Sequence, residues 1–251
     1  MKLTTVLLPA LAMTAQALTV PASLKPIFDV NDILAFVARI FPFDVTLEAA
    51  QKLSLAAEEA LALAQGFRTT RQELDDGRCG DLLVIFARGT QEPGNVGALV
   101  GPPFFKALER ALGGSHSLSV QGVEYEANVG GYLEGGDAEG SQGMASLVTE
   151  AFSTCPNSKI VLSGYSQGGQ LVHNAAKLLP ADTMKAVSSV VIFGDPDSSQ
   201  SVENVDSDKV LVICHKGDDI CQFGDLVKLE HLTYAQDADT AADFVVSKAV
   251  F

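Results

Sequence analysis

A serine within a glycine-rich pentapeptide is the strongest chemical signal in the sequence. Gly164-Tyr165-Ser166-Gln167-Gly168 fits the pattern G-x-S-x-G, in which the serine occupies a sharp turn from a strand into a helix. An apolar run at residues 160–162 precedes the pentapeptide, and a helical stretch beginning near Gly169 follows it. This context predicts that Ser166 is a nucleophile, raised above the edge of a sheet by its turn.

A serine hydroxyl is a weak nucleophile until a neighbouring base accepts its proton, and imidazole is the usual base. The chain has four histidines. His231 lies late in the chain and gives the order serine, acid, histidine that is typical of an α/β-hydrolase. His116 precedes Ser166, and His173 lies two turns along the following helix and points away. His215 adjoins a strand end, so we predict that His231 is the base.

The acid of such a site must lie between the serine and the histidine in the chain and at the end of a strand. Asp195 and Asp218 each follow a separate apolar run and meet this condition. The residues alone leave both candidates open, with a small preference for Asp218. Cys214 and Cys221 could close a short loop around Asp218, which would hold its carboxylate rigidly against an imidazole.

The charge that develops on a carbonyl oxygen under attack needs fixed hydrogen-bond donors. One donor is the backbone N–H after the nucleophile, which belongs to Gln167. The second should come from the loop after an early strand, here residues 88–95. Thr90 in that loop offers a backbone N–H and a hydroxyl, so Thr90 and Gln167 form the candidate oxyanion hole.

Short apolar runs predict the strands that would position these groups. Each run is bounded by polar or turn residues, as expected of strands buried on both faces. Helical patterns lie between the runs, and this alternation predicts a parallel sheet with helices on both faces. The runs are residues 82–87, 160–162, 190–193 and 210–213, and the helices are near residues 104–111, 143–152, 170–179 and 240–249.

Residues 18–65 have a different pattern, which is helical throughout. Asn31 can cap a first helix with apolar side chains between residues 33 and 41, and Thr46 can open a second, Ala- and Leu-rich helix. We favour a packed helical extension, with a lid over an apolar site or a pro-segment as the alternatives. A single catalytic domain would then span residues 66–251.

The N-terminus has the features of a secretory signal peptide. Lys2, an apolar run and Ala15-Gln16-Ala17 predict cleavage after residue 17 and an extracellular protein. Four cysteines in a secreted chain suggest two disulfides, and three pairings are possible. No apolar stretch reaches the length of a transmembrane helix.

Composition excludes several classes of function. The hydrophobic share of 47% provides a large core and excludes an intrinsically disordered chain. The net charge of −14 repels phosphate backbones, so we expect no nucleic-acid partner.

Five segments occur in an order that resembles the fungal cutinase family. The resemblance covers about residues 68–251. In chain order they are Cys79, Arg88-Gly89-Thr90-x-Glu92-x-Gly94-Asn95, Gly164-Tyr165-Ser166-Gln167-Gly168, Cys214-x-x-Gly217-Asp218-x-x-Cys221 and His231-Leu232-x-Tyr234.

The resemblance implies a secreted serine esterase that hydrolyses cutin, the plant-cuticle polyester, and short-chain esters. It implies an α/β-hydrolase fold, a three-layer sandwich with a central, mainly parallel sheet, to which this chain adds its helical extension. No metal or cofactor would be needed, and a monomer would act on a polyester or small ester. The resemblance assigns Ser166 as nucleophile, Asp218 as acid and His231 as base, with Thr90 and Gln167 as the oxyanion hole.

The resemblance also implies the disulfides Cys79–Cys155 and Cys214–Cys221. In the family an asparagine often follows a Tyr-x-Ala stretch and supports the oxyanion-hole side chain. Here the stretch at residues 125–127 is followed by glycines at 130 and 131, which leaves that support open.

Four apolar residues around the histidine are candidates for contact with an acyl chain, although ordinary packing explains them equally well. An acetylxylan esterase and a lipase-like acylglycerol hydrolase are the alternative enzymes, and a non-catalytic secreted surface protein is the alternative of another class. A non-catalytic protein would be expected to lack the serine, the acid or the histidine of the catalytic triad, whereas this chain has a candidate for all three. The apolar residues are Leu226, Val227, Leu229 and Leu232.

Overall fold

The computed structural model of the chain describes residues 30–41 and 43–251. The expected signal peptide, residues 1–17, lies outside the described residues. No described helix is both long enough and apolar enough to cross a membrane.

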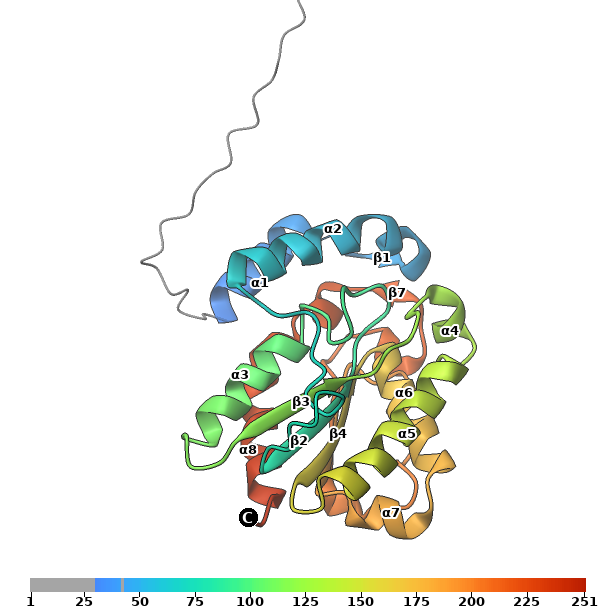
Figure 1. Ribbon diagram of the computed structural model, residues 1–251. Helices are drawn as coiled ribbons and strands as arrows, with labels where there is room; N and C mark the ends of the chain where they lie inside the picture. The colour runs from blue at the N-terminus through green and yellow to red at the C-terminus, as the bar shows by residue number, and fades with distance from the viewer. Residues whose placement is uncertain (1–29, 42) are drawn as a thin grey trace, which may run out of the picture.

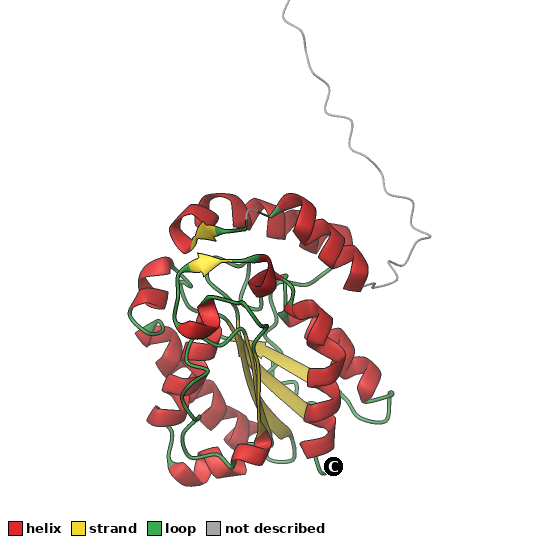
Figure 2. Cartoon of the chain, turned by 180° about the vertical axis from the view of Figure 1, so that it is seen from behind, coloured by secondary structure: helices red, strands yellow, loops and turns green. Residues whose placement is uncertain are grey.

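A five-stranded sheet forms the centre of the molecule, and every pair of neighbouring strands in it is parallel. The strand order is β3-β2-β4-β5-β6, so the carboxyl ends of all five strands meet at one edge (Figure 2). The strands are β2 Leu82–Ala87, β3 Leu118–Gly122, β4 Lys159–Tyr165, β5 Ser189–Phe193 and β6 Val210–Ile213.

Helices cover both faces of this sheet, as the alternating pattern predicts (Figure 1). The side chains of β2 explain why both faces need a covering layer, because alternate residues of a strand point to opposite faces of the sheet. Leu82, Val84 and Phe86 belong to the core under α3 and α8, whereas Leu83 and Ile85 belong to the core under α5 and α6. The helices are α3 Gly101–Ala111, α4 Val129–Leu133, α5 Ala138–Thr154, α6 Gln167–Leu178, α7 Ala181–Ala186 and α8 Ala238–Lys248.

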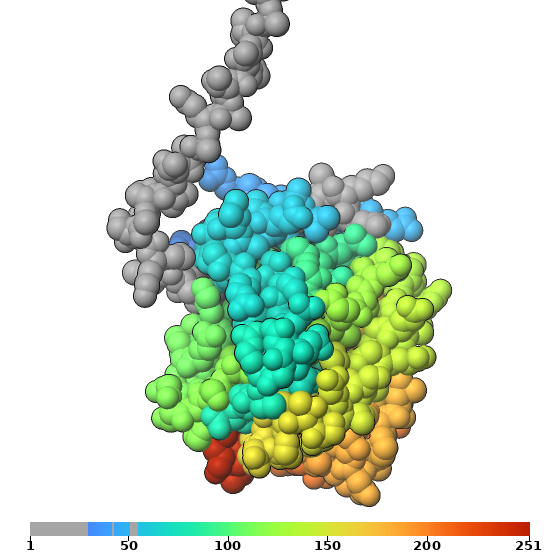
Figure 3. Space-filling view, viewed as in Figure 1, coloured from blue at the N-terminus to red at the C-terminus, as the bar shows by residue number. Residues whose placement is uncertain are grey.

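Residues 30–65 form a separate helical layer, which we call the cover; residues 66–251 are the body. The cover consists of α1 (Val30–Ile40), β1 (Val45–Thr46) and α2 (Leu47–Gln65). Figures 1 and 3 show it lying across one end of the body, on the side where the sheet strands have their carboxyl ends.

Apolar contact and a short β-ladder join the cover to the body. Buried Ile33, Val37 and Leu61 continue the core that lies under α3 and α8. Strand β1 pairs antiparallel with β7 (Leu226–Val227) of the body. These contacts pack the cover against the body at the carboxyl ends of the sheet strands.

The ends of the cover helices follow local rules only in part. Thr46 caps α2 as expected, because its hydroxyl accepts a hydrogen bond from the backbone N–H of Ala49 at 3.4 Å. Gly66 ends the helix in the left-handed region with φ of 63°. The expectation that Asn31 caps α1 is wrong, because α1 begins at Val30 and Asn31 is its second residue.

Two disulfides tie the body together, and both join the expected partners. Cys79–Cys155 links the start of β2 to the end of α5. Cys214–Cys221 closes the loop between β6 and the 3-10 helix Ile220–Gln222. Asp218 lies inside this second loop.

Candidate active site

Ser166 occupies a strained turn between β4 and α6. Its φ of 56° and ψ of −122° are unusual for a residue with a side chain, and such strain is typical of functional turns. The flanking glycines are required by space. A Cβ on Gly164 would lie 2.2 Å from the carbonyl oxygen of Gly168, and one on Gly168 would lie 2.1 Å from that of Ala87.

His231 and Asp218 form a buried pair. His231 lies in the 3-10 helix Leu229–Leu232, and its Nδ1 is 2.8 Å from Asp218 Oδ2. Both residues are almost fully buried, at 3% and 1% exposure. Burial alone would raise the pKa of Asp218, but hydrogen bonds from His231, Tyr234 and the backbone N–H of Ile220, with the charge of His231, lower this pKa below its usual value.

The second candidate acid lies in a different pair. Asp195 Oδ2 is 3.0 Å from His173 Nε2, and both side chains are buried beneath α6. Asp195 Oδ1 accepts a hydrogen bond from the backbone N–H of Asp197. The structure therefore brings Asp218, and not Asp195, to His231, as the resemblance implies.

The candidate oxyanion donors lie side by side. The side-chain amide of Gln167 donates to the hydroxyl of Thr90 at 3.0 Å and to the backbone oxygen of Asn128 at 2.7 Å. Asn128 directly follows Ala127 in the Tyr125–Ala127 stretch and was not among the predicted site residues. Its side chain caps α4 by accepting from the N–H of Gly131, so Gln167 supplies the contact to Thr90 that an asparagine would otherwise make.

A buried carboxylate fixes the loop that carries Thr90. Glu92 accepts hydrogen bonds from the backbone N–H groups of Gly89, Ala98 and Leu99 at 2.8 to 3.0 Å. Only glycine fits at position 97, where φ is 68° and a Cβ would lie 2.3 Å from this carboxylate. No motif analysis singled out Glu92 for this role, although it stands within the resembling segment.

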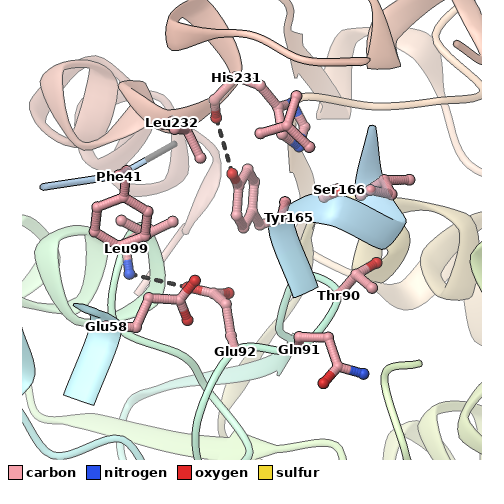
Figure 4. Close-up of a pocket in the computed structure, with 13 residues that line it drawn as sticks. Phe41, Glu58, Thr90, Gln91, Glu92, Leu99, Tyr165, Ser166, His231 and Leu232 are labelled. Carbon is pink, nitrogen blue, oxygen red and sulfur yellow. Dashed lines mark hydrogen bonds between the residues drawn. The ribbon is translucent and has the colours of Figure 1, made fainter. Parts of the chain in front are cut away.

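One pocket collects these groups beneath the cover (Figure 4). From the body, Ser166, His231 and Thr90 line it, together with Val227 and Leu232 from the predicted apolar rim. The other two rim candidates are not among its lining residues: Leu226 is exposed and Leu229 packs against the core.

The cover closes the pocket from above. Phe41, Leu47, Ala50 and Glu58 line it from the cover, and the three apolar residues are each less than 10% exposed. The cavity volume of about 40 Å³ holds a few water molecules and leaves no room for an ester with its acyl chain.

A carboxyl group of the cover meets a carboxyl group of the body inside this pocket. Glu58 of α2 is only 2% exposed, and Figure 4 shows its carboxyl directed toward that of Glu92. Burial raises the pKa of Glu58 well above its usual value, and the charge of Glu92 raises it further against the opposing charge of Arg88. The closed cover therefore favours the neutral form of Glu58.

In the described part of the chain, no three His, Cys, Asp or Glu side chains are grouped so that they could hold a metal ion. A parallel sheet with a strained serine turn, and a buried histidine–aspartate pair beside it, define the class of α/β-hydrolases.

Comparison with known proteins gives the family within that class. The family model for cutinase matches residues 78–249. A cutinase of Botryotinia fuckeliana is 58% identical over 68% of this chain and 84% of its own. A cutinase of Hypocrea jecorina is 49% identical over 86% of this chain and 85% of its own. The chain belongs to the cutinase family.

Solved structures extend the likeness beyond the body. A Trichoderma reesei cutinase in complex with a phosphonate inhibitor superposes with a TM-score of 0.76 at 48% identity, over 88% of this chain and 99% of its own. Because residues 66–251 make up about three quarters of the chain, this match includes part of the cover. An acetylxylan esterase matches with a TM-score of 0.51 at 21% identity, which shows the shared fold alone.

Proposed function

We propose that this chain is a serine esterase that hydrolyses the ester bonds of cutin and of short-chain esters through an acyl-enzyme on Ser166. The observation that carries the proposal is the buried, hydrogen-bonded pair of His231 and Asp218, in which His231 lines the same pocket as Ser166 on its nucleophile turn. Membership of the cutinase family supports the substrate class.

The reaction follows from the orientation of His231. Since Nδ1 of His231 is engaged by Asp218, its Nε2 is the atom left to serve Ser166. Ser166 Oγ bonds to the ester carbonyl carbon and its proton passes to Nε2. The bond to the alcohol then breaks, and His231 returns the proton to the leaving oxygen. Water repeats the sequence on the acyl-enzyme and releases the acid.

The oxyanion formed in each half-reaction needs donors that are already in place. The backbone N–H of Gln167 and the backbone N–H and hydroxyl of Thr90 are proposed as these donors. The hydrogen bond from the Gln167 amide orients the Thr90 hydroxyl, and Glu92 holds the loop behind it. The charge is thus met by groups that need no rearrangement.

The cover is proposed to act as a lid. Its residues Phe41 and Leu47 lie over the pocket, whose small volume excludes an acyl chain. A substrate reaches Ser166 only after the cover moves. A pro-segment would give a different outcome, because the mature secreted protein would then begin near residue 66, which N-terminal sequencing would detect.

We further propose that the protein is secreted and acts as a monomer without nucleic acid. The predicted signal peptide and two disulfides support secretion, because disulfides persist in oxidising compartments. The net charge of −14 disfavours binding to nucleic acid.

A fluorophosphonate probe tests the proposed function directly, since it labels an activated serine. We expect the full chain to be labelled and to hydrolyse p-nitrophenyl esters and cutin, and Ser166→Ala to lose labelling and turnover while it melts at nearly the same temperature. Ser163→Ala is a control within β4, because Ser163 is buried away from the pocket. Labelling that persists in Ser166→Ala would overturn the proposal.

A further inference from the structure

Tyr234 contacts the proposed acid and has no part in the mechanism described so far. Its ring is fully buried, and its hydroxyl donates to Asp218 Oδ2 at 2.7 Å. The same hydroxyl accepts a hydrogen bond from the backbone N–H of His215 at 2.9 Å. A phenol hydroxyl has one proton, and the backbone N–H of His215 does not use it because it donates to the oxygen. The hydroxyl proton of Tyr234 can therefore point at the carboxylate of Asp218.

This contact completes the set of donors around Asp218. Oδ2 accepts from His231 and Tyr234, and Oδ1 accepts from the backbone N–H of Ile220 at 3.0 Å. A carboxylate held by three donors on two sides cannot rotate about its side-chain bonds without losing one of them. Its orientation, and with it the orientation of the imidazole, is therefore fixed.

His215 holds the tyrosine in turn. Its imidazole stacks on the Tyr234 ring with centroids 4.0 Å apart. Its Nδ1 lies 2.7 Å from the backbone oxygen of Glu230, the residue before His231, and its Nε2 lies 2.7 Å from Asp237 Oδ2. Both oxygen partners are hydrogen-bond acceptors, and the Nε2 atom of His215 also lies 3.1 Å from the side-chain nitrogen of Gln236. His215 thus ties the tyrosine to the segment that carries His231.

We propose that Tyr234 is a positioning residue for the reaction: its hydroxyl, aimed by the backbone of His215, locks Asp218 in the orientation that holds His231 against Ser166. The inference rests on the proposed function of the triad. Burial lowers the pKa of His215, but its hydrogen bonds to Asp237 and to the backbone of Glu230, together with the charges of Asp237 and Asp218, raise this pKa above its usual value.

Tyr234→Phe in the full chain removes the hydroxyl and keeps the ring. We expect kcat on a soluble p-nitrophenyl ester to fall about tenfold with little change in KM, the scale of one hydrogen bond to a charged group. With one donor fewer, more of the Asp218 charge acts on His231, so the acid limb of the kcat/KM profile should move to higher pH. Glu58, Glu92 and Tyr165, which line the same pocket as His231, and Glu230, which precedes it in the chain, are unchanged in the variant.

Tyr132→Phe is the matched control. Tyr132 is 1% exposed, and its hydroxyl donates to the backbone oxygen of Gly224, so the substitution removes an equivalent buried hydroxyl without touching Asp218. We expect both variants to lower Tm and only Tyr234→Phe to lower kcat and move the acid limb. Equal losses of kcat in the two variants, or an unmoved acid limb, would overturn the proposal.

A double-mutant cycle separates this proposal from the proposed function. If Tyr234 acts through Asp218, Tyr234→Phe should cost almost nothing further in an Asp218→Asn background. Additive losses would show that Tyr234 acts elsewhere and would end the proposal. An Asp218→Asn variant that kept its turnover would instead overturn the triad itself, and Tyr234 with it.

Discussion

The cover and the body are held together by different kinds of interaction. In the body, the proposed catalytic groups are fixed by directional contacts: a strained turn at Ser166, a disulfide loop around Asp218 and buried hydrogen bonds to its carboxylate. The cover is held by apolar packing and by two residues of β-ladder, and it buries the carboxyl group of Glu58.

This difference separates chemistry from access. Apolar contacts have no preferred direction, so one apolar surface can provide the same burial as another. An apolar substrate surface can therefore replace the body as the partner of the cover. Hydrogen bonds to a buried carboxylate have no such substitute. Changes in the body should therefore alter turnover on every substrate, and changes in the cover should alter which substrates enter.

The largest expected effect lies in the body, at the choice between two aspartates. Asp218→Asn should lower kcat about 10⁴-fold on soluble and polymeric esters alike, because the imidazole loses the partner that sets its tautomer. Asp195→Asn is the matched control, since it alters the buried pair with His173 and should cost thermal stability while kcat changes only a few-fold. Steady-state kinetics and melting curves compare the two, and the reverse ranking would assign the acid to Asp195.

We expect one of the two disulfides to matter more for thermal stability and the other to matter more for turnover. Chain entropy assigns about 4.5 kcal/mol to the Cys79–Cys155 link, which spans 76 residues, and about 2.5 kcal/mol to the Cys214–Cys221 link, which spans 7. We expect Cys79→Ala/Cys155→Ala to lower Tm more. Cys214→Ala/Cys221→Ala should lower kcat more, about tenfold, because it frees the loop of Asp218.

Melting curves give the Tm of the two double variants, and kinetics on one soluble ester give their kcat. If the long-range pair also caused the larger loss of kcat, the rigidity of the Asp218 loop would not be what positions the acid.

The smallest expected effect belongs to the cover and depends on pH. The pKa of Glu58 is higher in the folded chain than in the unfolded one, so its contribution to stability is complete at low pH and is lost as pH rises through the folded value. Tm should therefore fall by a few degrees, about 3 °C, toward alkaline pH, and Glu58→Gln should flatten that dependence.

Glu59→Gln is the control for this substitution, because Glu59 is the exposed neighbour on α2. Its Tm profile should follow that of the unsubstituted chain. If Glu58→Gln kept the full pH dependence, the burial of Glu58 beneath the cover would not be its source.

The sequence predicted the strands that are continuous apolar runs and missed β3, in which polar and apolar residues alternate. The runs 82–87 and 210–213 match β2 and β6, because a continuous apolar run is a local signal. Strand β3 was missed because Ser119 and Gln121 interrupt its apolar pattern. Both are nevertheless buried, and the Gln121 side chain is satisfied by the backbone of Leu74 and Asp75.

The site was predictable where it depends on local turns and not where distant segments meet. The elbow at Ser166 could be recognised from five residues and their flanks. The choice of Asp218 over Asp195 needed the family resemblance, because both follow strands that lie side by side in the sheet. An amphipathic pattern likewise showed that α1 has an apolar face, but β1 is too short to reveal that the α2 residues Leu47, Ala50 and Glu58 lie over the pocket.

The most direct test of the account is a lock between the cover and the body. Thr46 and Leu226 lie directly opposite each other in the β1–β7 ladder, where Cβ atoms of antiparallel neighbours are about 5 Å apart. Thr46→Cys/Leu226→Cys should form a disulfide that holds the cover closed. The two single substitutions, and the unsubstituted chain in the same mild reductant, are the controls.

Activity on cutin and on a long-chain p-nitrophenyl ester should be compared before and after that reduction. We predict that the locked protein loses most of its activity on both substrates and regains it when the new disulfide is reduced, while the controls change little. A locked protein that hydrolyses both substrates at the unlocked rate would contradict the central claim that the cover must move before Ser166 can react.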